Sequence, residues 1–298
     1  MAKQFECALN FSEGKSQQVI RALVQAARGV TVLNVASDPD HNRTVVTYVG
    51  SAEATVAAAF QITAKAVELI DMNSHRGAHP RMGAVDVVPF VPLGAATMDE
   101  AINCARQLGQ RLGDELQIPV YLYEEAASSP QRKNLANVRR GEFEGLGAKL
   151  ADPLWRPDFG PAHPHPTAGA TAVGARIYLV AYNVNLGTSD VAIAQAIART
   201  VRAKTGGLQD VKALGVMIQA RNLAQVSMNV VNPFRTPLYR VLETVRMEAK
   251  LYGIPVVGSE VVGLIPLSVL LDAARYYLQI EDLTEDRVLE SRLWKDKT

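Results

Sequence analysis

The 298-residue chain predicts an α+β fold in which one order of strands and helices is used twice. Short stretches rich in β-branched residues alternate with longer segments of helical period in both halves of the chain. A stretch without any period, residues 152–174, is crowded with proline and glycine and separates the two halves. Because 48% of the residues are hydrophobic, a chain of this length can bury more than one core, which favours two domains.

The first half begins with an alternating strand and a polar turn, after which Val19, Ile20, Leu23 and Val24 recur at helical spacing. The expected elements are, in order, strand 3–9, helix 17–27, strands 30–36 and 44–49, helix 52–70 and strand 85–91. This βαββαβ order is the split-βαβ pattern of ferredoxin-like domains. A helix at 98–116 follows, with Thr97 and Glu100 spaced as a capping box. After it come a strand at 119–123 and a polar segment, 126–150, that contains another helix.

The second half repeats this order. The expected elements are strand 175–186, helix 189–203, strands 211–219 and 223–231, helix 236–252 with Pro237 at its first position, strand 254–257 and helix 267–278. An asparagine ends each of the two first strands, Asn10 and Asn185. We therefore predict two duplicated ferredoxin-like subdomains, residues 1–174 and 175–298, with a charged, peripheral tail at 280–298.

Composition excludes several classes of function. A net charge of +1 argues against a general nucleic-acid binder and against a basic protein of membrane surfaces. No run approaches 18 apolar residues, and the first residues lack the features of a signal peptide, so we expect a soluble, cytoplasmic protein. Cys7 and Cys104 both lie in apolar segments and fit reduced, structural thiols.

Chemically reactive side chains concentrate in residues 71–92, DMNSHRGAHPRMGAVDVVPFVP. Gly77, Pro80 and Gly83 prevent a continuous helix here, so the segment is a polar loop that leads into a strand. A loop of this kind, held between rigid elements, is the usual place for a reactive site.

His79 is the strongest candidate among the five histidines of the chain, which all lie in loops and precede residue 166. Pro80 restrains its backbone, Arg81 follows closely, and Asp86 is near enough in sequence to orient the imidazole ring. His75 and His79 have the i, i+4 spacing of zinc ligands on a helix, but Gly77 and Pro80 oppose that helix and no metalloprotease glutamate lies between them. We therefore expect no metal.

Two other loops are candidates for binding an anion. NFSEG, residues 10–14, is either a simple strand-to-helix turn or a set of backbone N–H groups that holds a carboxylate. SDPDHNRT, residues 37–44, is either a hairpin loop or the support of Arg43, whose guanidinium can bind a carboxylate by two hydrogen bonds. No phosphate-binding glycine loop, nucleophile elbow or dinucleotide fingerprint is present. The residues alone thus indicate a two-lobed enzyme with imidazole acid–base chemistry and an anionic substrate.

The chain resembles the glutamate formimidoyltransferase family, which also forms the transferase half of formimidoyltransferase-cyclodeaminase. The matching segments are ECALNFSEG (6–14), NRTVVTYVG (42–50), LIDMNSHRGAHPRMGAVDVVPF (69–90), IPVYLYEEAA (118–127), RRGEFEGL (139–146), PDFGP (157–161), AQVSMN (224–229) and VVGSEVVGLIPL (256–267). The resemblance implies transfer of a formimidoyl group between N5 of tetrahydrofolate and glutamate, in histidine degradation. It also implies two ferredoxin-like subdomains with the substrate cleft between them, and a homodimer.

The resemblance implies roles for individual residues as well. The histidine of the Gly-x-His-Pro-Arg-Met-Gly motif, here His79, is the family's catalytic residue. The folate-binding segment maps onto Gly160, Pro161, Ala162, His163, Pro164, His165, Pro166, Thr167, Ala168 and Gly169. From their chemistry, Arg43, Arg76 and Arg81 are candidates for binding the substrates' carboxylates. Asn10 is a candidate for binding or orienting substrate, and Asp86 is the candidate for orienting the histidine.

This sequence departs from the bifunctional enzymes at Leu9, where a proline is common, and in the connector, which has two additional histidines, His163 and His165. It also ends before any cyclodeaminase domain, so we expect ring closure to belong to another protein. Two alternatives stay open from sequence. One is a glutamate N-formyltransferase that uses 5-formyltetrahydrofolate, because sequence does not separate an imino from an oxo group. The other is a non-catalytic binder of folate or amino acids.

Overall fold

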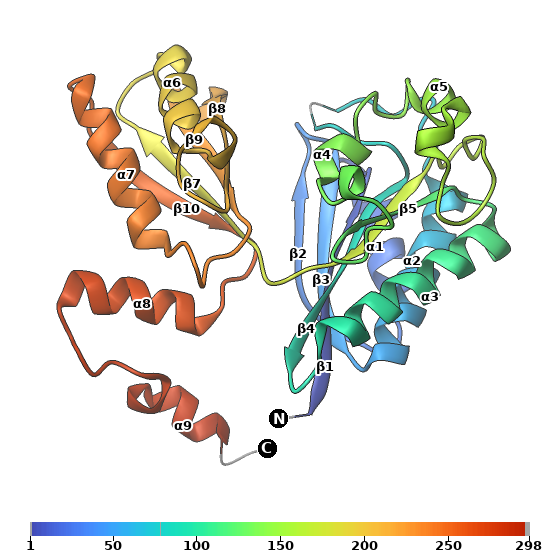
Figure 1. Ribbon diagram of the computed structural model, residues 1–298, viewed down its shortest axis with the longest axis horizontal. Coiled ribbons are helices and arrows are strands. Elements are labelled where there is room, and N and C mark those ends of the chain that lie inside the picture. Colours follow the sequence, from blue (N-terminus) through green and yellow to red (C-terminus); the bar gives the residue numbers. More distant parts are fainter. Residues whose placement is uncertain (1, 78, 296–298) are drawn as a thin grey trace. The chain divides into compact units, whose positions relative to one another are not determined.

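A computed structural model describes residues 2–77 and 79–295, so that position 78 of the reactive loop and positions 296–298 of the tail lie outside the described residues. The chain divides into two compact units, one up to Ile177 and one from Tyr178 onward. Each unit has its own β-sheet and its own hydrophobic core. The fold is therefore a mixed α+β fold with two domains, as predicted (Figure 1).

The first unit contains six strands and five α-helices among its described residues. They are β1 (Lys3–Phe11), α1 (Gln17–Gln25), β2 (Thr31–Asp38), β3 (Arg43–Gly50), α2 (Ala52–Leu69), β4 (Val85–Gly94), α3 (Met98–Leu116), β5 (Val120–Glu124), α4 (Leu135–Val138), α5 (Leu146–Ala151) and β6 (Thr171–Ala175). The predicted capping box is present at the start of α3, where the side chains of Thr97 and Glu100 bind each other's backbone N–H groups.

The six strands form one sheet in the order β2-β3-β1-β4-β6-β5. β1 pairs antiparallel with both β3 and β4, whereas β6 runs parallel to both β4 and β5. One face of the sheet packs on α1, α2 and α3, through buried side chains such as Leu9, Tyr48 and Phe90 (Figure 1). On the other face, α4 and α5 cover only the β4-β6-β5 side, where Tyr121 contacts a smaller apolar cluster.

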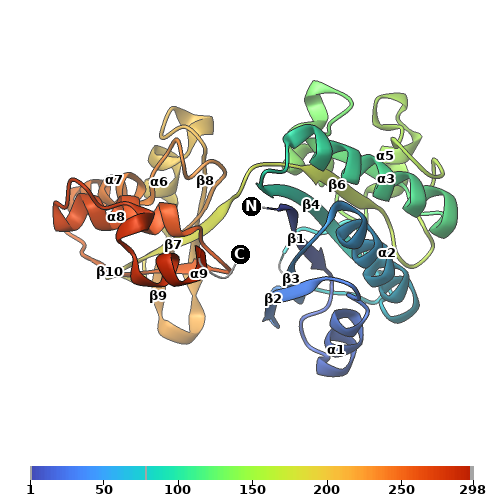
Figure 2. The same ribbon diagram turned by 90° about the horizontal axis from the view of Figure 1, so that it is seen from below.

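The second unit contains four strands and four α-helices among its described residues. They are β7 (Val180–Leu186), α6 (Val191–Val201), β8 (Val211–Ile218), β9 (Leu223–Val230), α7 (Leu238–Leu251), β10 (Val256–Val262), α8 (Leu267–Leu278) and α9 (Leu289–Lys295). All neighbouring strands are antiparallel, in the order β10-β7-β9-β8. α6 and α7 lie on the same face of this sheet and enclose the second core with Val184, Ile197 and Val241 (Figure 2).

The two sheets share one strand order. Read from the edge, β2-β3-β1-β4 in the first unit corresponds to β8-β9-β7-β10 in the second. In both units the first strand of the motif is central, and the fourth strand of the motif lies beside it. The two units thus share their strand pairing as well as the order of their elements, as expected for a duplication.

Four features differ from the predictions. Residues 171–174, predicted to be irregular, belong to β6, and the single strand predicted at 175–186 is interrupted between Ala175 and Val180. β6 is held by parallel pairing with strands that are distant in sequence, which no local pattern reveals. The strand predicted at 254–257 continues to Val262 along β7, and Pro237 is the N-cap residue of α7 rather than its first residue.

Candidate active site

The reactive loop lies against the turn between β2 and β3. Gly77 is required at this contact, because a Cβ atom there would be 2.2 Å from the carbonyl oxygen of His41. Gly83 is required for a similar reason, since its Cβ would be 2.1 Å from the carbonyl oxygen of Ala170. Both ends of the loop are therefore pressed against neighbouring backbone, which restricts where His79 can lie.

Asn42 connects three segments of the first unit. It adopts the left-handed conformation, with φ of 50°, at the turn before β3. Its Oδ1 accepts a hydrogen bond from the N–H of Gly14 at 3.0 Å, and its Nδ2 donates to the carbonyl of Arg76 at 2.9 Å. Its own carbonyl accepts from Nε2 of His75 at 2.9 Å. The NFSEG turn, the β2–β3 turn and the reactive loop are thus joined by one side chain and its backbone.

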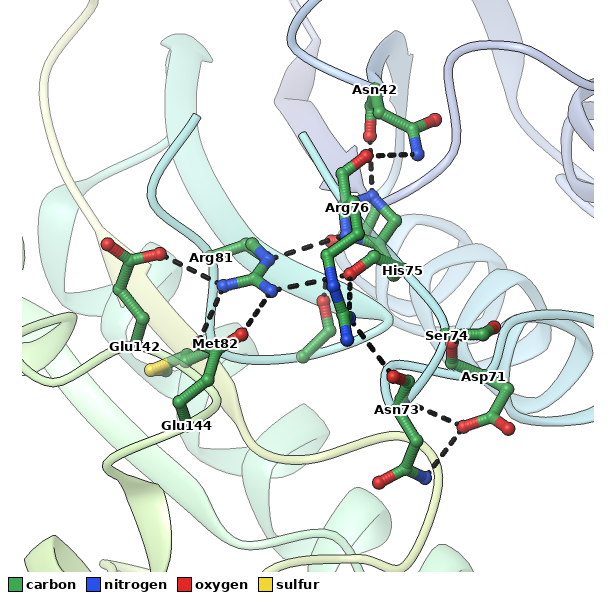
Figure 3. A network of polar contacts seen from close by, with 12 residues as sticks. Asn42, Asp71, Asn73, Ser74, His75, Arg76, Arg81, Met82, Glu142 and Glu144 are labelled. Carbon is green, nitrogen blue, oxygen red and sulfur yellow. Dashed lines mark hydrogen bonds and ion pairs between the residues drawn. The ribbon is translucent and has the colours of Figure 1, made fainter. Parts of the chain in front are cut away.

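His75 has a structural role in this network, which Figure 3 shows. Nε of Arg81 lies 3.4 Å from Nδ1 of His75, and because a guanidinium only donates, Nδ1 is the acceptor and Nε2 carries the proton. Burial lowers the pKa of His75, which also favours this neutral form. Arg81 in turn donates to Glu142 at 3.0 Å and to Glu144 at 2.6 and 2.8 Å. Its guanidinium is therefore already bound by carboxylates of the protein.

A small pocket opens between these segments. Its lining includes five of the predicted site residues and five of their neighbours, namely Asn10, Phe11, Ser12, His41, Asn42, Arg43, His75, His79, Arg81 and Asp86. The side chains come from the end of β1, the β2–β3 turn, the reactive loop and the start of β4. Segments separated by up to about 75 positions in sequence thus meet at one point, because β1 lies between β3 and β4.

His79 has a buried ring nitrogen in this pocket, Nδ1, which has no hydrogen-bond partner among the described residues. Burial, followed by the positive charges of Arg43 and Arg139, lowers the pKa of His79 from 6.5 to about 3. The His41 ring lies 6.0 Å away, edge-on, between centroids. At neutral pH the His79 imidazole is therefore uncharged and available to accept a proton.

Arg43 is a second unsatisfied group in the same pocket. Within residues 2–77 and 79–295, no hydrogen bond or ion pair of its guanidinium is present. Burial and the charge of Arg139 lower the pKa of Arg43 to about 10, whereas Asp86 and Asp38 act in the opposite direction. A buried guanidinium without a bound carboxylate is costly, so an anion in the pocket would stabilise Arg43.

The sequence predicts that Asp86 orients the His79 ring, and the structure gives this carboxylate other partners. Asp86 Oδ2 accepts from Nε and a terminal nitrogen of Arg139, at 2.9 and 2.5 Å, and Oδ1 accepts from the N–H of Met82 at 2.9 Å. Both bonds from Arg139 go to one oxygen, and bonds from a charged guanidinium are stronger than a bond from a neutral imidazole. In the described structure Asp86 therefore positions Arg139 and the reactive loop, and does not bind His79.

The end of the proline-rich connector lies beside the reactive loop. The carbonyl of Thr167 accepts from the N–H of Met72 at 2.8 Å, and the carbonyl of Ala168 accepts from the N–H of Ala84 at 2.9 Å. Asn73 Nδ2 adds a bond of 2.9 Å to the carbonyl of Pro166. None of the connector residues is among those that line the His79 pocket in the described structure. The part of the connector near Gly169 therefore supports the loop from the side.

The other end of the connector packs elsewhere in the first unit. Gly160, with φ of 80°, lies against α3 and the carbonyl of Ile118, which would be 2.3 Å from a Cβ at this position. Asp158, just before it, binds Arg132 at 2.7 Å and the N–H of Leu122 at 2.8 Å. His163 is exposed, whereas Nδ1 of His165 accepts from the N–H groups of Thr167 and Ala168. His165 thus stabilises the turn at the end of the connector.

Arg76 lies outside the His79 pocket. It lines an open depression of about 430 Å³ together with Gly77, Arg81, Gly141, Glu142 and Glu144. Its NH1 donates to the carbonyls of Asn73 and His75, at 3.0 and 2.7 Å, while the side chain is exposed. Of the five residues predicted to bind or orient substrate, the structure therefore groups Asn10, Arg43, Arg81 and Asp86 with His79 and places Arg76 beside them.

The sequence did not predict that Arg139 belongs to the site or that Asn42 connects its segments. A signal for Arg139 existed, because a carboxylate inside an apolar strand, such as Asp86 in β4, needs a cation when it is buried. The segment 126–150 offers several cations, and only the tertiary fold selects Arg139 among them. The described residues contain no group of three or more histidine, cysteine, aspartate or glutamate side chains arranged to hold a metal ion. No described helix combines the length and apolarity that crossing a bilayer requires.

Two family models and several curated proteins match nearly the whole chain. The model of the formiminotransferase domain, N-terminal subdomain, matches residues 4–176, and that of the formiminotransferase domain matches residues 181–292. The chain is 50% identical to glutamate formimidoyltransferase of Streptococcus pyogenes serotype M1, over 98% of this chain and 99% of that protein. It is 47% identical to glutamate formimidoyltransferase of Thermoplasma acidophilum, over 97% of both. It is also 46% identical to formimidoyltransferase-cyclodeaminase of Rattus norvegicus, over 95% of this chain and 54% of that protein. The chain belongs to the formiminotransferase family.

Proposed function

We propose that this protein is a glutamate formimidoyltransferase, which transfers the formimidoyl group between 5-formimidoyltetrahydrofolate and L-glutamate in histidine degradation. The observation that carries the proposal is the pairing, in one pocket, of an imidazole whose buried Nδ1 has no partner and a guanidinium that has none, among the described residues. The reaction needs a base and a site for an anion, and this pocket offers one of each. Two relatives of the same length bear this name.

In the proposed mechanism, His79 moves the two protons of the reaction. The glutamate amine loses a proton to the neutral imidazole and attacks the formimidoyl carbon, which gives a tetrahedral intermediate. The bond between that carbon and N5 of the folate then breaks, and N5 takes the proton from the imidazolium. The same steps in reverse describe transfer to tetrahydrofolate. No covalent enzyme intermediate is required, and the protonation state of His79 is restored after each turnover.

Arg43 is the proposed carboxylate-binding residue. An uncompensated guanidinium that faces the pocket can bind a glutamate carboxylate by donating two hydrogen bonds. Arg139 adds a second positive charge nearby, while Asp86 fixes its position. A bound carboxylate would offset both cations, which oppose protonation of His79 in the free protein. Substrate binding would therefore raise the pKa of His79 and make it a more effective base.

The remaining assignments rest on the family. We propose that residues 160–169 contribute to folate binding, that Arg76 and Arg81 line the approach of an anionic substrate, and that Asn10 contacts a substrate in the pocket. Arg81 would have to share its guanidinium with Glu142 and Glu144. We further propose that each unit is a ferredoxin-like subdomain, the first carrying the catalytic histidine. The repeated strand order supports that assignment.

A transfer assay with two donors tests the function. Purified protein is mixed with glutamate and either 5-formimidoyltetrahydrofolate or 5-formyltetrahydrofolate, and loss of the donor is followed by absorbance while the glutamate product is identified by mass spectrometry. We expect N-formimidoylglutamate from the first donor and a much lower rate from the second. Faster formation of N-formylglutamate would replace the proposal with a formyltransferase. Tight folate binding without turnover of either donor would indicate a binding protein.

A further inference from the structure

The turn between β2 and β3 brings a second imidazole to the His79 pocket. His41 lines this pocket, and its ring lies edge-on to the His79 ring with 6.0 Å between the two centroids. Two rings at this separation can both hydrogen-bond to one nitrogen atom placed between them. The side chain of His41 is 49% exposed, whereas Nδ1 of His79 is buried. The pocket therefore combines one imidazole that is in contact with solvent and one that is largely withdrawn from it.

Asp38 fixes the tautomer of His41. Its Oδ2 lies 2.6 Å from Nδ1 of His41, and its Oδ1 accepts from the N–H groups of Asp40 and His41, both at 2.9 Å. Although burial acts in the opposite direction, these bonds lower the pKa of Asp38, so its carboxylate is charged at neutral pH. A charged carboxylate only accepts hydrogen bonds, so Nδ1 of His41 carries the proton and Nε2 keeps its lone pair. A carboxylate bound in this way also stabilises the imidazolium that forms when Nε2 takes a proton.

Close backbone contacts hold the β2–β3 turn on two sides. A Cβ at Gly14 would be 2.2 Å from the carbonyl oxygen of Asp38, and a Cβ at Gly77 would be 2.2 Å from that of His41. The NFSEG turn thus packs on one end of the β2–β3 turn, and the reactive loop packs on the other. Because His79 belongs to the loop that touches the backbone of His41, the two imidazoles are positioned relative to each other.

The other groups of the pocket lining are not available as bases in the described structure. The charged or titratable residues of the lining are His41, Arg43, His75, His79, Arg81 and Asp86. The carboxylate of Asp86 is bound by Arg139, and both ring nitrogens of His75 are hydrogen-bonded. The arginines only donate hydrogen bonds. Nε2 of His41 and the ring of His79 are therefore the two groups of the lining that can take a proton from a substrate.

The proton transfers assigned to His79 begin from a neutral glutamate amine. Free glutamate is instead an ammonium ion at neutral pH, because the pKa of an α-amino group is about 8 or higher. Its nitrogen must therefore lose one proton before it attacks the formimidoyl carbon and another as the new C–N bond forms. N5 of the folate takes up one of these when its bond to carbon breaks, and the formimidoyl nitrogen keeps its hydrogens. One proton per turnover is left, and it must reach solvent.

We propose that His41 is a second acid–base residue, whose Nε2 takes the ammonium proton of glutamate and passes it to solvent before His79 acts. This assignment rests on the proposed function for the identity of the substrate. His41 is suited to the step because Asp38 stabilises its imidazolium and because half of its side chain is in contact with water. His79 is less suited, since burial and the charges of Arg43 and Arg139 all oppose a positive charge on its ring. In the reverse reaction, His41 returns a proton to the departing amine.

The pH dependence of transfer separates this role from a structural one. In His41→Gln the amide can still donate a hydrogen bond to Asp38 but cannot take a proton. At neutral pH we expect kcat/KM for glutamate to fall by about 10²-fold or more. The loss should become small toward a pH of about 10, because free glutamate then supplies the neutral amine itself. His79→Ala should stay slow over the same range, since N5 still needs its proton. The control Asp40→Asn removes a charge from the same turn and should leave the wild-type profile unchanged.

A second measurement needs no turnover. Full-length protein labelled at histidine is titrated, with tetrahydrofolate present, with L-glutamate or with glutarate, which has the same two carboxylates but no amine. The Nε2 signal of His41, assigned by its absence from His41→Gln, should shift with L-glutamate and not with glutarate. Any other NMR result, normal transfer by His41→Gln at neutral pH, or a loss that is equal at every pH would overturn the role of His41. A wild type that transfers nothing would refute the proposed function, and the NMR comparison would still decide whether an amine lies against His41.

Discussion

At the scale of single residues, the account depends on an imidazole that is kept neutral by its surroundings. His79 is partly buried and lies near two guanidinium groups, and each of these features disfavours the imidazolium. Burial also lowers the pKa of His75, four residues earlier, but both of its ring nitrogens are bound, one by Arg81 and the other by the carbonyl of Asn42. One ring nitrogen of His79 is free of hydrogen bonds in the described structure, whereas both ring nitrogens of His75 are hydrogen-bonded. This difference gives the two histidines different roles, which sequence alone only suggested.

Removing the charge of Arg43 should therefore raise the pKa of His79. Arg43→Met keeps much of the buried volume and removes one of the two cations, so the pKa of His79 should move from about 3 toward 6.5. The titration of the His79 ring can be followed by NMR of protein labelled at histidine. Saturating glutamate should raise this pKa in the wild type but not in Arg43→Met.

The matched control is Arg111→Met, which removes a cation that binds Glu115 on the exposed surface of α3. It should leave the titration of His79 unchanged. If the His79 ring titrates near 6.5 in the wild type, or if Arg43→Met has no effect, the electrostatic description of the pocket does not hold.

At the scale of elements, the reactive loop is positioned by close backbone contacts rather than by secondary structure of its own. Gly77 meets the β2–β3 turn and Gly83 meets the start of β6. Asn42 and the backbone near Ala168 then hold the loop on two sides. A loop that is fixed in this way can present one imidazole at a defined point, which proton transfer requires.

Gly77→Ala should displace the loop. The added methyl group would lie 2.2 Å from the carbonyl oxygen of His41, so we expect a loss of about 1–3 kcal/mol in unfolding free energy and a large fall in activity. Gly147→Ala is the control, because no atom lies within 4 Å of its added Cβ and it lies in α5. It should be neutral or stabilise by up to about 1 kcal/mol. Urea denaturation and the transfer assay measure both effects. Normal activity in Gly77→Ala would show that the contact does not position His79.

Sequence patterns predicted most elements, and the reasons for the exceptions are physical. α3 has both a strong helical period and a capping box, so its bounds were predicted without error. β6 has neither a period nor a turn signal, since it is a short buried strand that exists only by pairing with β4 and β5. The candidate residues His79, Arg43 and Asp86 could be named from local sequence. The selection of Arg139 as the partner of Asp86 could not, because it depends on contacts between segments that are distant in sequence.

At the scale of the whole molecule, the chain consists of two units with separate hydrophobic cores. Leu108 of α3 is completely buried in the first core, and Leu186 of β7 is completely buried in the second. Each unit repeats the strand order of the other. The homodimer stays a prediction that follows from the family, and the cytoplasmic location stays a prediction from the sequence.

Because the two cores are separate, a mutation in one core should reduce protection from hydrogen exchange only in its own unit. Leu108→Ala and Leu186→Ala each remove a fully buried side chain and should cost about 2–5 kcal/mol within the unit concerned. Hydrogen exchange of the full-length protein, read by mass spectrometry, should show faster exchange in residues up to 177 for the first variant and from 178 onward for the second. Equal acceleration in both units by either variant would show that the chain unfolds as one cooperative body.

The central claim, that His79 transfers the protons of the reaction, is tested most directly by the turnover of His79→Ala. The account predicts that kcat falls by about 10²–10⁴-fold because the general acid–base is lost. It also predicts that the Kd for 5-formyltetrahydrofolate and the urea midpoint at neutral pH change little, since Nδ1 of His79 has no partner among the described residues. Near-normal kcat in this variant, with folding and folate binding intact, would contradict the account.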